Sequence, residues 1–197
     1  MSVVESARKA QGKVDSVSSL CNNFIVSNSA SRAERISSAL LKAAVDDARA
    51  IIFLITHADN LNVGPATTLL RPLTEKLKRG AWAAMADNNE VENAYDNDKF
   101  PGGDKVVKDI ERRDPSCTLY SNIFKLASPI LHGYVHGGAE LIRAYFDDGD
   151  EHVLRENVYK SILEFISSLS IEAGFVFMKY GLRHDNEALI RLKLNLP

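Results

Sequence analysis

Hydrophobic residues recur along most of this chain at the three-and-four spacing of helices that bury one face. Near the N-terminus they follow a heptad pattern, which predicts an amphipathic helix over Val3–Val26. Its seam consists mainly of small residues, at Val3, Ala7, Ala10, Val14, Val17, Cys21 and Phe24. Small side chains bury little apolar area, so we expect this helix to dock on the rest of the chain or on a second subunit.

The same periodicity predicts further helices after the turn at residues 27–31. The first of them is apolar nearly all round in its second half, ARAIIFLI, which is typical of a central helix. A second runs from Pro65 to about Ala86, a third begins near Cys117, and a long one spans Glu151–Tyr180. A short tail helix over Glu187–Leu194 completes the set.

No two-residue strand period competes with these helices, so the pattern predicts an all-α fold, an up-and-down bundle of five to seven helices. Pro72 and Pro129 should kink two of the helices, because proline lacks the backbone N–H and its ring crowds the preceding turn. We expect a single domain over residues 1–197. Residues 1–27 form its docking or dimerisation helix, and residues 87–116 form a polar surface excursion with a short helix at Asp104–Arg113.

The composition is that of an ordinary globular protein, with 45% hydrophobic and 25% charged residues and a net charge of −2. Such a charge gives no strong positive field, so nucleic-acid binding is expected only if a local basic patch exists. The longest apolar run, Ala50–Thr56, is shorter than the roughly 20 residues that a membrane span requires. We therefore expect a soluble, cytoplasmic protein without a membrane segment or cofactor.

Several polar residues interrupt the apolar helical segments. Arg71 and Glu75 are four residues apart beside Pro72, and His132 and His136 are four apart just before Gly137-Gly138. The glycine pair would let another helix approach closely. A buried network of Arg71, Glu75 and His136 would then fix the register of the bundle, since an unpaired buried polar group costs about 1–3 kcal/mol.

The same residues also allow a catalytic interpretation. Arg71 would bind a phosphate or carboxylate, His136 would act as general base, and Glu75 would orient one of them. His132, Gly137 and Gly138 would then contribute to ligand binding. No metal site is expected, because Gly133 replaces the glutamate of an HExxH motif and no ExxH pair follows.

Two short motifs, LRPLTEKLKRGAWAAMA and LHGYVHGGAEL, resemble a group of uncharacterised bacterial all-helical proteins. These proteins share an RPLxE helix that ends near a tryptophan and a later histidine-glycine-glycine turn. The matching positions are Arg71, Glu75, Trp82, His136, Gly137 and Gly138, and the likeness extends over residues 35–180. The resemblance implies a bacterial source and a helical fold, but no reaction.

A more distant resemblance is to HEPN-like helical ribonucleases, which often have toxin or abortive-infection roles. Their site has a histidine four to six residues after an arginine. Here His57 is eight residues after Arg49, and His152 is nine after Arg143, so that motif is absent. An HEPN-like site would have to combine Arg71 with His136 from different helices.

Two functions therefore stay open. The first is a helical protein that acts through a protein partner or as a homo-oligomer, with Val3–Phe24 as the contact, in a stress or phage-defence context. The second is a hydrolase or HEPN-like ribonuclease that uses Arg71, Glu75 and His136.

Overall fold

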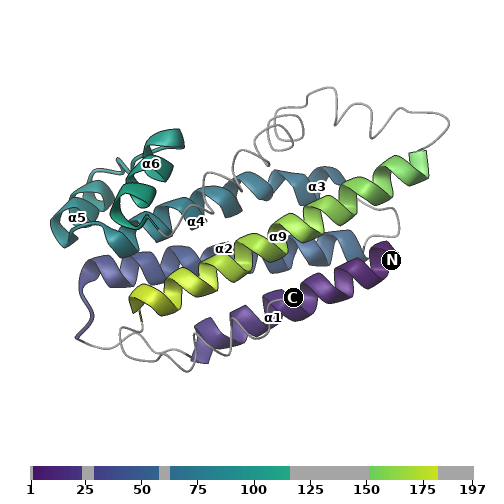
Figure 1. The fold of residues 1–197 in the computed structure, drawn as a ribbon, viewed down its shortest axis with the longest axis horizontal. Coiled ribbons are helices and arrows are strands. Elements are labelled where there is room, and N and C mark those ends of the chain that lie inside the picture. The colour runs from purple at the N-terminus through teal and green to yellow at the C-terminus, as the bar shows by residue number, and fades with distance from the viewer. Residues whose placement is uncertain (1, 24–28, 58–62, 116–150, 182–197) are drawn as a thin grey trace.

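The computed structural model describes residues 2–23, 29–57, 63–115 and 151–181. Within these ranges the chain forms helices and no strand, which confirms the all-α prediction. Four long helices make the body of the molecule: α1 (Val3–Asn23), α2 (Arg32–His57), α4 (Leu70–Met85) and α9 (Glu151–Gly181). In Figure 1 they lie side by side, and the shorter α5 (Asn88–Asp96) and α6 (Gly103–Arg113) lie together at one end.

Helix α2 occupies the centre of this arrangement. It packs against α1, α4 and α9, and α1 and α4 each also contact α9. Ile51, Ile52 and Ile55 of α2 are at most 2% exposed, as the apolar run ARAIIFLI predicted. The two packed helices α2 and α9 therefore form the middle of the bundle, with α1 and α4 on either side (Figure 1).

The seam of α1 is buried within the chain itself. Every seam position that the structure describes is at most 9% exposed: Val3, Ala7, Ala10, Val14, Val17 and Cys21. These residues face α2 and α9, so α1 docks on the body of the protein. Phe24 lies outside the described residues. A partner that meets α1 in this docked position contacts its other faces.

The segment predicted as one helix from Pro65 to Ala86 is divided at Leu69. Helix α3 covers Val63–Thr68, and α4 begins at Leu70, which places Pro72 in its first turn. There a missing N–H costs nothing, because the first N–H groups of a helix have no partner within it. In a continuous helix the Pro72 ring would clash with the carbonyl of Thr68, so the interruption falls one turn before the proline. Pro129 lies outside the described residues.

The polar excursion contains one helix more than predicted. Helix α6 matches the expected segment at Asp104–Arg113, but α5 was missed because NNEVENAYD carries few apolar residues. Its start has a recognisable signal, since the Glu90 carboxylate accepts a hydrogen bond from the Asp87 backbone N–H at 3.3 Å. Val91 is fully buried and Ala94 nearly so, and this narrow stripe holds α5 on the bundle.

Helix α9 contains one stretch, Tyr159–Tyr180, that is long and apolar enough to cross a membrane by length and composition alone. Of the most apolar part of this stretch, 67% is buried inside the protein. This stretch is not one uninterrupted apolar run in the sequence, because serines and Glu172 interrupt it. Two of the buried serines, Ser167 and Ser170, donate their hydroxyls to the carbonyls of Leu163 and Ile166 in the preceding turn. Packing against α1, α2 and α4 accounts for the apolar character of α9.

Helices α2 and α4 approach each other closely at Gly80. A Cβ atom at this position would lie 2.9 Å from Cγ of Leu41 and 3.2 Å from Cβ of Leu40. The short distance lets the buried Ser37 hydroxyl donate a 2.8 Å hydrogen bond to the Gly80 carbonyl. The glycine therefore sets both the spacing of the two helices and their register.

We expect Gly80→Ala to destabilise the protein by about 1 kcal/mol or more. The added methyl overlaps Leu41, which is 1% exposed and has little room to move, and this outweighs the higher helix propensity of alanine. Gly12→Ala is the matched control, since nothing lies within 4 Å of a Cβ at that position. It should stabilise α1 by about 0.5–1 kcal/mol. Urea unfolding of both variants measures the difference, and equal effects would contradict this role of Gly80.

Candidate functional site

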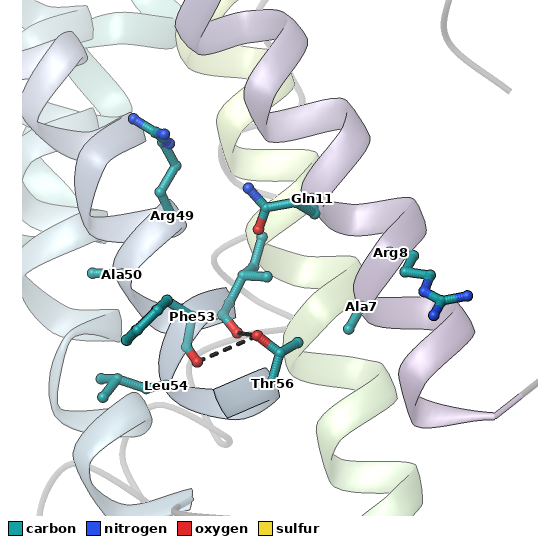
Figure 2. A pocket seen from close by; sticks show the side chains of 9 residues that line it. Ala7, Arg8, Gln11, Arg49, Ala50, Phe53, Leu54 and Thr56 are labelled. Atoms are coloured by element: carbon teal, nitrogen blue, oxygen red, sulfur yellow. Dashed lines mark hydrogen bonds between the residues drawn. The ribbon is translucent and has the colours of Figure 1, made fainter. Parts of the chain in front are cut away.

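Among the described residues, a groove of about 640 Å³ lies between α1 and α2. Its floor is mostly aliphatic and aromatic, formed by Ala7, Ala50, Ile52, Phe53 and Leu54. Figure 2 shows Arg8 extending from α1 and Arg49 from α2, with Gln11 and Thr56 lying between the two helices. The groove thus combines an apolar floor with two cationic side chains.

The groove follows from how the two helices expose their surfaces. Ala7 belongs to the buried seam of α1, and its short side chain leaves open space beside α2. On α2, Ile52 faces inward at 1% exposed, while the neighbouring Phe53 side chain is 58% exposed. A half-exposed phenylalanine on such a floor is the kind of residue that anchors a bound chain.

Sequence reasoning missed this surface. Phe53 sits inside ARAIIFLI, which is apolar nearly all round and therefore predicted a central helix. The signal that could have located it is the arginine four residues earlier, because Arg49 and Phe53 share one helix face and an exposed arginine marks that face as solvent-accessible. The α1 half of the groove could not be found this way, because it depends on how α1 docks.

The predicted site residues on α4 are not paired with each other. Arg71 is exposed, and no ion pair joins it to Glu75. The Glu75 carboxylate instead lies 3.8 Å from Nε of Arg79, one turn further along the helix. Trp82 of the same motif is buried, at 4% exposed.

The other predicted site residues lie outside the described residues: His132, His136, Gly137 and Gly138. A site that combines Arg71, Glu75 and His136 therefore stays a prediction. The close helix approach expected at that glycine pair also stays a prediction; within the described part of the chain, Gly80 makes such an approach.

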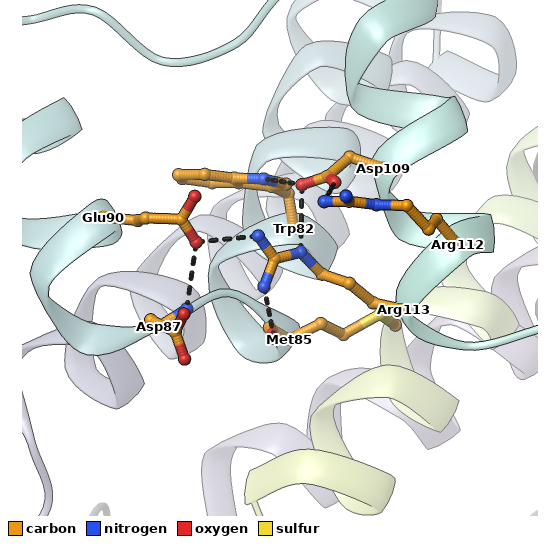
Figure 3. Close-up of polar contacts among 7 residues, drawn as sticks. All are labelled: Trp82, Met85, Asp87, Glu90, Asp109, Arg112 and Arg113. Carbon is orange, nitrogen blue, oxygen red and sulfur yellow. Dashed lines mark hydrogen bonds and ion pairs between the residues drawn. The ribbon is translucent and has the colours of Figure 1, made fainter.

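A polar cluster joins α4, α5 and α6. Asp109 of α6 accepts hydrogen bonds from Nε1 of Trp82 and Nε of Arg113, each at 2.9 Å, and from Arg112 (Figure 3). Burial by itself would raise the pKa of Asp109, but the bonds from Arg113, Trp82 and Arg112 outweigh it and lower that pKa. Asp109 is therefore ionised at neutral pH and holds the buried tryptophan in place.

Arg113 extends this cluster to α5. Its guanidinium donates to the Glu90 carboxylate at 2.7 Å and to the Met85 carbonyl at 3.4 Å. The Phe100 ring packs edge to face against Trp82, with ring centroids 6.2 Å apart. All the charged groups have partners here, so the cluster fastens the α5–α6 excursion to α4 and shows no open ligand position.

A second cavity, of about 190 Å³, lies among the ends of α2, α4 and α9. Several polar groups at its wall are already engaged, because Ser37 donates to Gly80 and Glu34 accepts from the Ser31 backbone N–H at 2.7 Å. Tyr180, also at the wall, donates its hydroxyl to Asp114. These groups serve helix capping and packing, which makes the α1–α2 groove the stronger binding surface.

Glu172 of α9 is a buried acid, only 8% exposed. Burial raises the pKa of its carboxyl to about 7. The Lys179 ammonium lowers that pKa in part, and the Asp114 carboxylate raises it slightly further. Lys179 and Asp114 are themselves hydrogen-bonded at the end of α9. This carboxyl therefore changes charge near neutral pH.

Metal-binding and thiol chemistry find no support in the part of the chain that the structure describes. No group of three histidine, cysteine, aspartate or glutamate side chains gathers there. Cys21 is buried in the α1 seam, and this burial raises the pKa of its thiol to about 11, which keeps the thiol protonated and unreactive at neutral pH.

No protein-family model, curated protein or solved structure matches this chain at a significant level.

Arg113 and Arg112 provide a paired test of the polar cluster. We expect Arg113→Ala to cost about 2 kcal/mol, because its side chain is only 20% exposed and its loss takes the ion pair from Glu90 and leaves Asp109 with the exposed Arg112. Arg112→Ala should cost under about 1 kcal/mol, since that side chain is 73% exposed although it binds the same Asp109. Urea unfolding, with amide hydrogen exchange of α5 and α6, separates the two variants. Equal costs would refute the anchoring role of Arg113.

The stability of the protein should fall as pH rises from about 5 to 8. A carboxyl whose folded pKa, about 7, exceeds its unfolded value of 4.5 binds its proton more tightly in the folded state. Its contribution is therefore fully present below the unfolded pKa and is lost as pH rises through the folded pKa, a change of about 3 kcal/mol. Glu172→Gln should remove most of this slope in urea unfolding at pH 5 and pH 8. An unchanged slope in the variant would assign it to another group.

Proposed function

We propose that this chain is a helical interaction protein, which works by binding another protein or a second copy of itself through the groove between α1 and α2. The observation that carries this proposal is the half-exposed Phe53 on an apolar floor, flanked by Arg8 and Arg49. An aromatic anchor beside arginines is the composition found at the centres of protein interfaces.

The groove allows a clearer test of binding than the α1 seam proposed from the sequence, because that seam is buried within the chain. Removing Val3–Phe24 would expose the core faces of α2 and α9, so a lost complex could reflect unfolding alone. Changes at Phe53 leave the core intact, because more than half of that side chain is exposed. They test binding separately from folding.

We expect Phe53→Glu to abolish complex formation while the protein stays folded. Losing a buried phenylalanine costs about 1.5–3 kcal/mol, which is about tenfold to a hundredfold in affinity, and burying a charged carboxylate on the apolar floor adds a further penalty. Sedimentation velocity across the micromolar range measures self-association. A photocrosslinking amino acid at position 53, in cells that produce the protein, reports binding to another protein through a crosslinked adduct.

Position 95 provides the matched control. Tyr95 is 52% exposed on α5, at the far end of the bundle from the groove (Figure 1), so Tyr95→Glu and a crosslinker there should leave complexes unchanged. A wild-type protein that stays monomeric and gives no adduct specific to position 53 would overturn the proposal.

A further inference from the structure

We propose that the groove binds an amphipathic helix from a different protein, one whose apolar stripe is flanked by acidic residues. This inference rests on the proposed function and names the chemistry of the partner. Three arguments support it: the length of the groove, the charges at its edges, and the repulsion between arginines that a second copy of the chain would bring.

The length of the groove suits about two turns of a helix. Its α2 wall runs from Arg49 to Thr56, seven residue steps, which is about 10 Å at the helical rise. An amphipathic helix that presents apolar residues at positions i, i+3, i+4 and i+7 covers the same distance with one continuous stripe. On the floor, Phe53 and Leu54 would contact that stripe.

The charges of the groove favour an acidic guest. Both charged residues that line it are arginines, Arg8 on α1 and Arg49 on α2, and they lie on different walls (Figure 2). Arg49 has Asp15 at 3.3 Å, but both side chains are about half exposed, so this ion pair is weak and can rearrange. Arg8 lies near Glu5, whose carboxylate already accepts the Ser2 backbone N–H at 2.8 Å. A guest with carboxylates along both edges of its stripe would meet one guanidinium on each side.

A second copy of the same chain fits less well. In a two-fold dimer the same patch meets itself, so the groove of one copy would face the groove of the other. Arg8 and Arg49 of both copies would then gather at one apolar interface, where like charges repel and lose their water. An acidic helix from a different protein turns the same arginines into attractive contacts.

Two designed helical peptides test this directly on the full-length protein. They carry the same leucine and phenylalanine stripe and the same dye, and differ only in having glutamates or lysines at the flanking positions. Fluorescence anisotropy should show the glutamate peptide binding at least about tenfold more tightly. Its affinity should fall as salt approaches about 1 M, where charges are screened within about 3 Å.

Variants of the two arginines then locate the effect. The double variant Arg8→Glu/Arg49→Glu should reverse the preference and bind the lysine peptide more tightly. Arg8→Gln/Arg49→Gln should remove the preference without reversing it, and this milder pair keeps the test valid if charge reversal disturbs the fold. Phe53→Glu should abolish binding of both peptides. Arg112→Glu is the control, since Arg112 is 73% exposed on α6, outside the groove, and binding should be unchanged.

Three results would overturn the inference. Equal affinity for the two peptides, or a preference that survives the arginine variants, would show that Arg8 and Arg49 do not select an acidic partner. If neither peptide binds while the protein forms a dimer that Phe53→Glu abolishes, the occupant is a second copy, and the proposed function still holds. If neither peptide binds and no complex depends on Phe53, the inference and the proposed function fail together.

Discussion

The close contact between α2 and α4 at Gly80 is the constraint on which the rest of the described structure depends. Without a side chain at this position, Leu41 fills the space against α4 and Ser37 reaches the Gly80 carbonyl. Because the bond joins particular residues of both helices, it favours one register and one rotation of α4 on α2. A glycine in a helix costs about 1 kcal/mol relative to alanine, and the packing it permits compensates for that cost.

The fixed rotation of α4 has consequences at both ends of the helix. Toward its C-terminus, Trp82 points to α6, where Asp109 and Arg113 fasten a segment whose Val106 and Ile110 are also buried in the core. Toward its N-terminus, Arg71 remains exposed and Glu75 pairs with Arg79. Because α2 uses its other faces for α4, α9 and α1, only the strip with Arg49 and Phe53 remains at the surface. The groove is therefore a result of how α2 is buried.

The sequence predicted the features that depend on local periodicity. The α1 seam and the buried face of α2 follow from spacing alone, and each seam position described is at most 9% exposed. Features that depend on contacts between neighbouring helical turns were harder to predict from the sequence. The break at Leu69 comes from a clash one turn before Pro72, and α5 rests on two buried residues and a capping interaction rather than on an apolar face. Neither leaves a strong hydrophobic pattern.

The candidate site was harder to predict because its parts come from helices that are distant in the sequence. Arg8 lies near the start of α1 and Arg49 in the second half of α2, and only the docking of α1 brings them to one groove. Polar residues inside apolar segments, on which the predicted site was based, indicate buried pairs and catalytic groups. A binding groove has the opposite character, because its defining feature is an apolar residue left at the surface. In the sequence, Phe53 cannot be distinguished from the buried apolar residues next to it, and Arg8 and Arg49 cannot be distinguished from other surface arginines. What distinguishes them is that both walls carry the same sign of charge beside one apolar floor, a relation that exists only in the folded chain.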